Sequence, residues 1–143
     1  MTRTYHRRPD ARKVVFTCLL AATAAAYGFL RWRPFQVEVE GPSMRPMLEP
    51  GDWAIAVVPG RLRRGHVVVV EHPDRPGFDL VKRVIGLPGD VAPDGFRLVD
   101  AVWVEGDDPK RSTDSREFGP VAVPLVRGRL RVVWWPPGRI RWL

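Results

Sequence analysis

Hydrophobic and polar positions divide the chain into an apolar N-terminal stretch and a longer region of short segments. Residues 14–30 carry no charged side chain. As an α-helix this stretch spans roughly 25 Å at 1.5 Å per residue, which is at the short end for the hydrocarbon core of a bilayer. Trp32 adds an aromatic side chain suited to the membrane interface. The pattern predicts a transmembrane anchor over residues 14–32.

From Phe35 onward the chain reads as short β-strands separated by turn residues. Residues 36–40 alternate apolar and polar side chains, and residues 67–71 form a β-branched run. Pro and Gly punctuate the sequence, and no long amphipathic helix follows residue 30. We therefore expect a mainly β protein with one all-β catalytic domain over residues 35–143, large enough to fold alone. Further strands are expected at residues 53–58, 79–85, 97–104 and 129–135.

Charge on the two sides of the anchor indicates its orientation. Basic residues are more numerous before the anchor than at its C-terminal end, where Arg31 and Arg33 stand. The positive-inside rule then predicts that residues 1–13 form a basic cytoplasmic N-terminus and that the β domain lies on the outer face. A cleaved signal peptide is an alternative, because the alanines at 24–26 offer a small-residue cleavage site. A buried helix of a soluble protein is a third interpretation.

The net charge of +7 suits a lipid membrane surface or a nucleic acid. No nucleic-acid-binding motif accompanies the charge, so we expect the membrane and no nucleic acid as a partner. The histidines, His6, His66 and His72, lack the spacing of metal ligands, and the single cysteine excludes an intramolecular disulfide. We expect no metal and no cofactor.

Ser43 and Lys82 are the residues in which the sequence suggests chemistry. Pro42 and Pro46 flank the serine and favour a stiff, non-helical turn that exposes its hydroxyl. The lysine lies in a largely apolar segment, where burial would lower its pKa towards neutrality. A neutral lysine can take the proton of a serine hydroxyl, so the pair predicts a serine nucleophile activated by a lysine base.

Four sequence boxes follow in the order found in the type I signal peptidases, and over residues 37–142 the chain resembles this family. The boxes are GPSMRPML at 41–48, GDWAIAV at 51–57, KRVIGLPGD at 82–90 and EGDDPKRSTDSREFGPV at 105–121. The closing stretch is most similar to the small mitochondrial inner-membrane peptidase and its short bacterial relatives. Larger relatives insert a second β domain between the last two boxes. This chain has no room for it, so the resemblance implies a minimal catalytic core.

The resemblance also implies roles for individual residues. Ser43 matches the nucleophile and Lys82 the general base. Ser112 falls at the position of a hydroxyl that orients the lysine amine. Asp114 and Arg116 match a structural ion pair beside the site.

An extended peptide substrate is expected to pair with a free strand edge beside the serine. Gly41 stands where some family members have a serine that donates to the oxyanion, so the oxyanion hole would rest on the backbone N–H of Ser43. The predicted walls of the pockets for small substrate side chains are Met44, Trp53, Ile55 and Val84.

These features together predict a membrane-anchored serine endopeptidase that removes signal peptides or presequences from exported preproteins after small residues. The alternatives are a dedicated maturation protease for one client, a self-cleaving repressor of the SOS-response type, and a non-enzymatic membrane-tethered module that binds peptides. Whether the protein works with a partner subunit is left open, because the mitochondrial relatives work in a complex. The expected location is the bacterial cell membrane, with the mitochondrial inner membrane as the alternative.

Overall fold

The computed structural model describes residues 11–143, which form an N-terminal helix and a compact β domain from Pro34 to Leu143. Helix α1 (Ala11–Trp32) contains a segment, Arg12–Phe29, that is long and apolar enough to cross a membrane. The hydroxyls of Thr17 and Thr23 donate to carbonyls of the helix itself, which satisfies them without water. Residues 1–10 of the predicted basic N-terminus lie outside the described residues.

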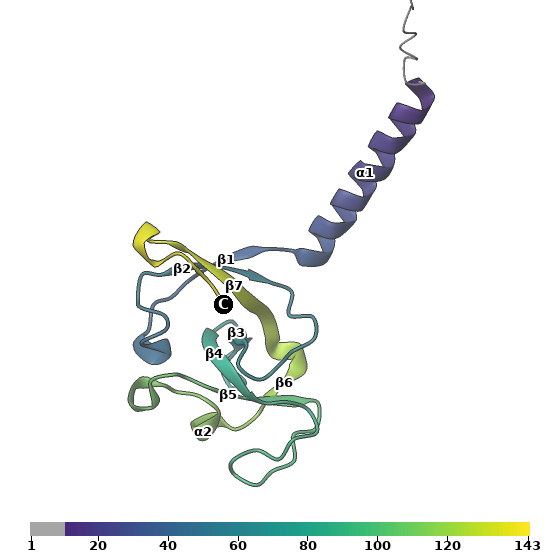
Figure 1. Cartoon of the computed structure of the whole chain (residues 1–143). Coiled ribbons are helices and arrows are strands. Elements are labelled where there is room, and N and C mark those ends of the chain that lie inside the picture. Colours follow the sequence, from purple (N-terminus) through teal and green to yellow (C-terminus); the bar gives the residue numbers. More distant parts are fainter. Residues whose placement is uncertain (1–10) are drawn as a thin grey trace, which may run out of the picture. The chain divides into compact units, whose positions relative to one another are not determined.

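The domain is mainly β, as predicted, and is built on one antiparallel sheet. Its strand order is β1-β2-β7-β3-β4-β5-β6, and β8 pairs with β7. Figure 1 shows the sheet curving, with β1, β2 and β7 on one side and β3, β4 and β5 on the other. The strands are β1 (Phe35–Glu38), β2 (Trp53–Val57), β3 (Val67–Glu71), β4 (Asp79–Gly86), β5 (Ala101–Glu105), β6 (Val121–Ala122), β7 (Val126–Trp135) and β8 (Arg141–Trp142).

Strand β3 explains how one sheet encloses two hydrophobic clusters. Its four valines are all buried, and successive side chains of a strand point to opposite faces. Val67 and Val69 therefore pack into a first cluster with β1, β2 and β7, whereas Val68 and Val70 pack into a second cluster with β4, β5 and β6. A continuous apolar run in the sequence thus marks the strand that is covered on both faces.

Most predicted strands agree with the structure to within a few residues, but the strand expected at 97–104 begins only at Ala101. Arg97 instead bridges to Val91 in a separate small hairpin. Asp100 then adopts a positive φ of 49°, which interrupts the extended backbone before β5. The two-residue strands β6 and β8 are too short to leave an alternating pattern in the sequence.

Candidate active site

Ser43 lies on a single 3₁₀ turn, Pro42–Met44, that follows the extended residue Gly41. The Arg45 N–H donates to the Pro42 carbonyl and closes the turn at 3.0 Å. Met44 is 1% exposed and packs into the first cluster, which fixes the turn against the core. The proline and the buried methionine together hold the serine in place while its hydroxyl faces outward from the core.

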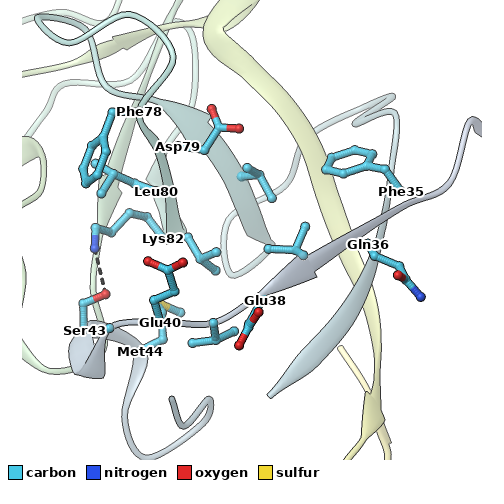
Figure 2. Close-up of a pocket in the computed structure, with 15 residues that line it drawn as sticks. Phe35, Gln36, Glu38, Glu40, Ser43, Met44, Phe78, Asp79, Leu80 and Lys82 are labelled. Carbon is cyan, nitrogen blue, oxygen red and sulfur yellow. Dashed lines mark hydrogen bonds between the residues drawn. The ribbon is translucent and has the colours of Figure 1, made fainter. Parts of the chain in front are cut away.

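Lys82 reaches the serine from β4. It is paired in register with Val68 on β3, is only 2% exposed, and its Nζ donates to Ser43 Oγ at 2.8 Å (Figure 2). Burial is the largest influence on this amine and lowers its pKa below 10.5; the Asp114 carboxylate opposes that shift and nearby Arg116 adds to it. The ammonium is therefore easier to deprotonate than that of an exposed lysine.

Asp114 is a buried carboxylate whose charge acts on Lys82, and it is the acceptor for several donors. It receives the Gly106 N–H at 2.9 Å, the Ser112 hydroxyl at 2.5 Å and Arg116 Nε at 2.8 Å. Its complete burial would by itself raise its pKa, but these donors outweigh burial and lower the pKa to about 2. Asp114 is therefore ionised at neutral pH and offsets part of the desolvation of Lys82.

The loop that begins at Gly106 contacts the main chain of Ser43. The Asp108 N–H donates to the Ser43 carbonyl at 2.9 Å. A Cβ added at Gly106 would lie 2.2 Å from Ser112 Oγ and 2.6 Å from the Ser43 carbonyl oxygen. Only a glycine therefore lets the loop pass between the nucleophile turn and Ser112.

The same loop also holds the strand that carries the lysine, through a contact that the sequence analysis missed. Arg83 Nε donates to Asp107 Oδ1 at 2.7 Å, and Arg83 Nη1 donates to the Gly65 carbonyl at 2.8 Å. Arg83 directly follows Lys82, and Asp107 lies in the last sequence box. The signal available in the sequence was that both residues lie in the boxes that carry the site. Only the pairing of β4 with β5 shows that their side chains meet.

A groove of about 600 Å³ opens beside the Ser43 and Lys82 pair. Within residues 11–143, β1 pairs only with β2, and β4 pairs with β5 only from Arg83 onward. Both strands therefore leave an edge without a described strand partner at the groove. An extended peptide could hydrogen-bond to both edges. The groove is lined by residues 35–41, 78–82, Ser43, Met44 and Val69.

The residues predicted to form the substrate pockets do not all line the groove. Met44 lines the groove, whereas Trp53 lines a separate hollow with Gln36, Trp134 and Trp135. Ile55 is half-buried on β2, and Val84 is fully buried in the second cluster; neither lines the groove.

Ser112 lies beside the nucleophile turn, but its hydroxyl donates to Asp114, and no hydrogen bond between Ser112 and Lys82 is present in the described part of the chain. Asp114 and Arg116 do form an ion pair, with Arg116 Nη2 and Asp114 Oδ2 2.5 Å apart. Residues 11–143 contain no group of three or more His, Cys, Asp or Glu side chains placed to hold a metal ion.

Comparison with known proteins points to one family. The model of signal peptidases, peptidase S26, matches residues 11–92. Mitochondrial inner membrane protease subunit 1 of Mus musculus is 35% identical over 136 aligned positions, which cover 82% of each chain. Subunit 2 of Mus musculus is 34% identical, covering 82% of this chain and 77% of the relative. The mitochondrial ATP-independent inner membrane protease subunit 1a of Arabidopsis thaliana is 34% identical, covering 85% and 79%.

Proposed function

The chain belongs to the signal peptidase family, peptidase S26, and from this membership we propose that it is a membrane-anchored serine endopeptidase whose nucleophile is Ser43 and whose general base is Lys82. Its substrates are preproteins from which it removes signal peptides or presequences after small residues. The observation that carries the proposal is the 2.8 Å contact between Lys82 Nζ and Ser43 Oγ, with the lysine buried.

The reaction begins when Lys82 is neutral and its Nζ accepts the Ser43 hydroxyl proton. Ser43 Oγ then attacks the scissile carbonyl carbon, and the Ser43 backbone N–H donates to the developing oxyanion. The Lys82 ammonium returns the proton to the leaving amine, which departs and leaves an acyl-enzyme. Neutral Lys82 next activates a water that attacks the ester carbonyl, and the proton returns to Ser43 Oγ as the acid product leaves.

The groove supports a substrate bound in extended form. The free edges of β1 and of residues 79–82 offer backbone groups on both sides of a peptide strand. Val37, Val39 and Val81 all pack on the first cluster and, with Met44, leave room at the groove for small side chains on one face of such a strand. This geometry favours small residues at alternate positions before the scissile bond.

Helix α1 supports retention at a membrane as the anchor, residues 14–32, with residues 1–13 on one side and the β domain on the other. The names of the relatives favour the mitochondrial inner membrane, the alternative considered from the sequence, and the word "subunit" in those names favours a partner. The bacterial cell membrane stays a prediction from the sequence alone. Ser112 acts on Lys82 through Asp114 in this proposal, and Arg116 fixes that carboxylate.

The test is cleavage of a secretory preprotein with Ala at −3 and −1 by the full chain in detergent. Ser43→Ala and Lys82→Met are compared with Lys110→Met, which changes an exposed lysine outside the groove. Cleavage at the expected bond by the wild type and Lys110→Met alone supports the proposal. Full cleavage by either Ser43→Ala or Lys82→Met rejects the dyad. Failure of the folded wild type to cleave this preprotein favours a dedicated client, to be tested with presequence-bearing inner-membrane proteins.

A further inference from the structure

Two exposed carboxylates stand at the groove of a chain whose net charge is +7. Glu38 and Glu40 are exposed, line the groove from the β1 side, and form no ion pair with any of residues 11–143 (Figure 2). Asp79 lies across the groove, where Arg127 Nε binds its Oδ1 at 3.0 Å. Among the described residues that line the groove, Lys82 alone is cationic, and in its reactive form it is neutral.

The two strands beside the groove each present two different faces. On the β1 side, Val37 and Val39 pack on the first cluster, so Glu38 and Glu40 point to the opposite face. On β4, Val81 packs on that same first cluster. Leu80, which packs on the second cluster, and Lys82 alternate with Val81 and therefore share the face of the glutamates. Phe78 directly precedes β4 and lines the same groove. The groove thus has an apolar wall and a second wall of carboxylates, which also contains the exposed Phe78 and the half-buried Leu80.

An extended peptide in this groove must distribute its side chains between those walls. Counting from the scissile bond towards the substrate N-terminus, P1 and P3 point to one wall and P2 and P4 to the other. The apolar wall takes the small P1 and P3 side chains of the proposed function. The P2 and P4 side chains then lie alongside Glu38 and Glu40.

We propose that Glu38 and Glu40 are specificity-determining residues that select substrates with lysine or arginine at P2 or P4. This inference rests on the proposed function, because it assumes that a peptide is cut in this groove. The second wall suits both the aliphatic stems and the charged ends of lysine and arginine side chains. Their aliphatic stems pack on Leu80 and on Phe78, whose side chain is 51% exposed, while their charged ends reach the carboxylates. The face of the Phe78 ring also attracts a cation.

The size of the effect follows from the exposure of the carboxylates. Exposed ion pairs contribute modestly, so one glutamate changes kcat/KM by about three- to five-fold between a basic and a neutral side chain. Exchanging lysine for glutamate at P2 replaces attraction by repulsion, and we expect a ratio of about ten-fold in favour of lysine. Salt screens exposed charges, so the ratio falls as ionic strength rises towards about 1 M.

The experiment measures kcat/KM of the full chain in detergent on peptides with Ala at P1. One reference peptide has Ala throughout P2–P4, and the others carry Lys or Glu at P2, P3 or P4. The variants are Glu38→Gln with Glu40→Gln, which keeps the side-chain shape, and Asp94→Asn as a control in an exposed turn outside the groove.

We expect wild type and Asp94→Asn to prefer Lys over Glu at P2 or P4 by about ten-fold, and the double variant to cut this ratio to about two-fold. The ratio at P3 should be the same in all three proteins, because that side chain faces the apolar wall. Equal cleavage of the Lys and Glu peptides by the wild type, or an unchanged ratio in the double variant, overturns the inference while leaving the proposed function intact. Absence of cleavage of every peptide, the reference included, overturns both.

Discussion

Lys82 Nζ lies 2.8 Å from Ser43 Oγ although 39 residues separate the two in sequence. The loop that starts at Gly106 is hydrogen-bonded to the main chain of Ser43 and to the side chain of the residue that follows Lys82. Asp108 binds the carbonyl of Ser43, and Asp107 binds Arg83, the residue after Lys82. The distance between nucleophile and base therefore depends on a third segment as well as on the strands that carry them. Substitutions in this loop are therefore expected to act on the position of the pair, whereas substitutions of Ser43 or Lys82 remove a reacting group.

The pH dependence of the reaction should report the protonation of Lys82. The base acts only when neutral, and burial lowers the pKa of this amine from 10.5. The value of kcat/KM should therefore rise with pH as the ammonium loses its proton, and it should level off at a pH below 10.5. The measurement is the rate of peptide cleavage from pH 5 to pH 10. A rate that falls as pH rises through this range would contradict lysine as the base.

Ser112→Ala tests whether this serine positions the lysine through Asp114. The substitution removes the hydroxyl that Asp114 accepts at 2.5 Å, and it leaves Lys82 itself intact. We expect kcat to fall by about ten-fold with KM nearly unchanged, because substrate does not touch Ser112 but the base is less well placed.

The matched control is Ser115→Ala, which also removes a buried serine hydroxyl. Ser115 Oγ accepts the Val104 N–H at 3.0 Å, and in the described part of the chain its hydroxyl forms no hydrogen bond with the Asp114 carboxylate. Its loss should cost about 1–2 kcal/mol of unfolding free energy with kcat retained. Equal kcat values for Ser112→Ala and the wild type would limit Ser112 to a structural role.

Local patterns made several parts of this molecule predictable. The β-branched run at 67–71 indicated a buried strand, and the structure has β3 over the same residues. Ser43 between prolines indicated a stiff, non-helical turn; a turn is present, but it is 3₁₀-helical and Ser43 on it is half-buried. Features of this kind depend on neighbours in sequence, whose conformational preferences act without the rest of the fold.

Apart from the Ser43 and Lys82 pair, long-range contacts between side chains were the part that the sequence did not reveal. The contact of Arg83 with Asp107 requires the register of β4 against β5, which a bulge between Val84 and Gly86 shifts. Trp53 was expected in the substrate pocket, but its side of β2 turns towards Trp134 and Trp135 on β7. Which face of a strand meets which partner depends on register, and one residue of slip reverses it.

Acid should destabilise the domain through Asp114. Its pKa is about 2 in the folded protein and 3.8 in the absence of the fold, so the folded state favours the ionised form. That contribution is fully present above pH 4 and is lost as pH falls from about 4 to about 2; a difference of this size corresponds to about 2 kcal/mol.

The measurement compares unfolding of the wild type, Asp114→Asn and Asp94→Asn in urea at pH 7, 4, 3 and 2.5, followed by tryptophan fluorescence. We expect Asp114→Asn to be less stable at pH 7, because Arg116 loses the nearer of its two carboxylate partners, and to lose less stability than the wild type below pH 4. Asp94→Asn alters an exposed turn residue and should follow the wild type. Parallel pH curves for Asp114→Asn and the wild type would show that other carboxylates account for the acid sensitivity.

Gly106→Ala should impair catalysis more than it impairs stability. The added Cβ would lie 2.6 Å from the Ser43 carbonyl oxygen, a backbone atom that can yield only if the nucleophile turn moves. Crowding of this kind typically costs about 1–3 kcal/mol of stability. A displacement of the nucleophile by about 1 Å can cost on the order of 100-fold in rate.

Gly138→Ala is the control, since nothing lies within 4 Å of a Cβ at that position. We expect kcat/KM to fall by about 100-fold in Gly106→Ala and to stay near the wild-type value in Gly138→Ala. If Gly106→Ala folded and cleaved at the wild-type rate, the loop would not control the position of Ser43.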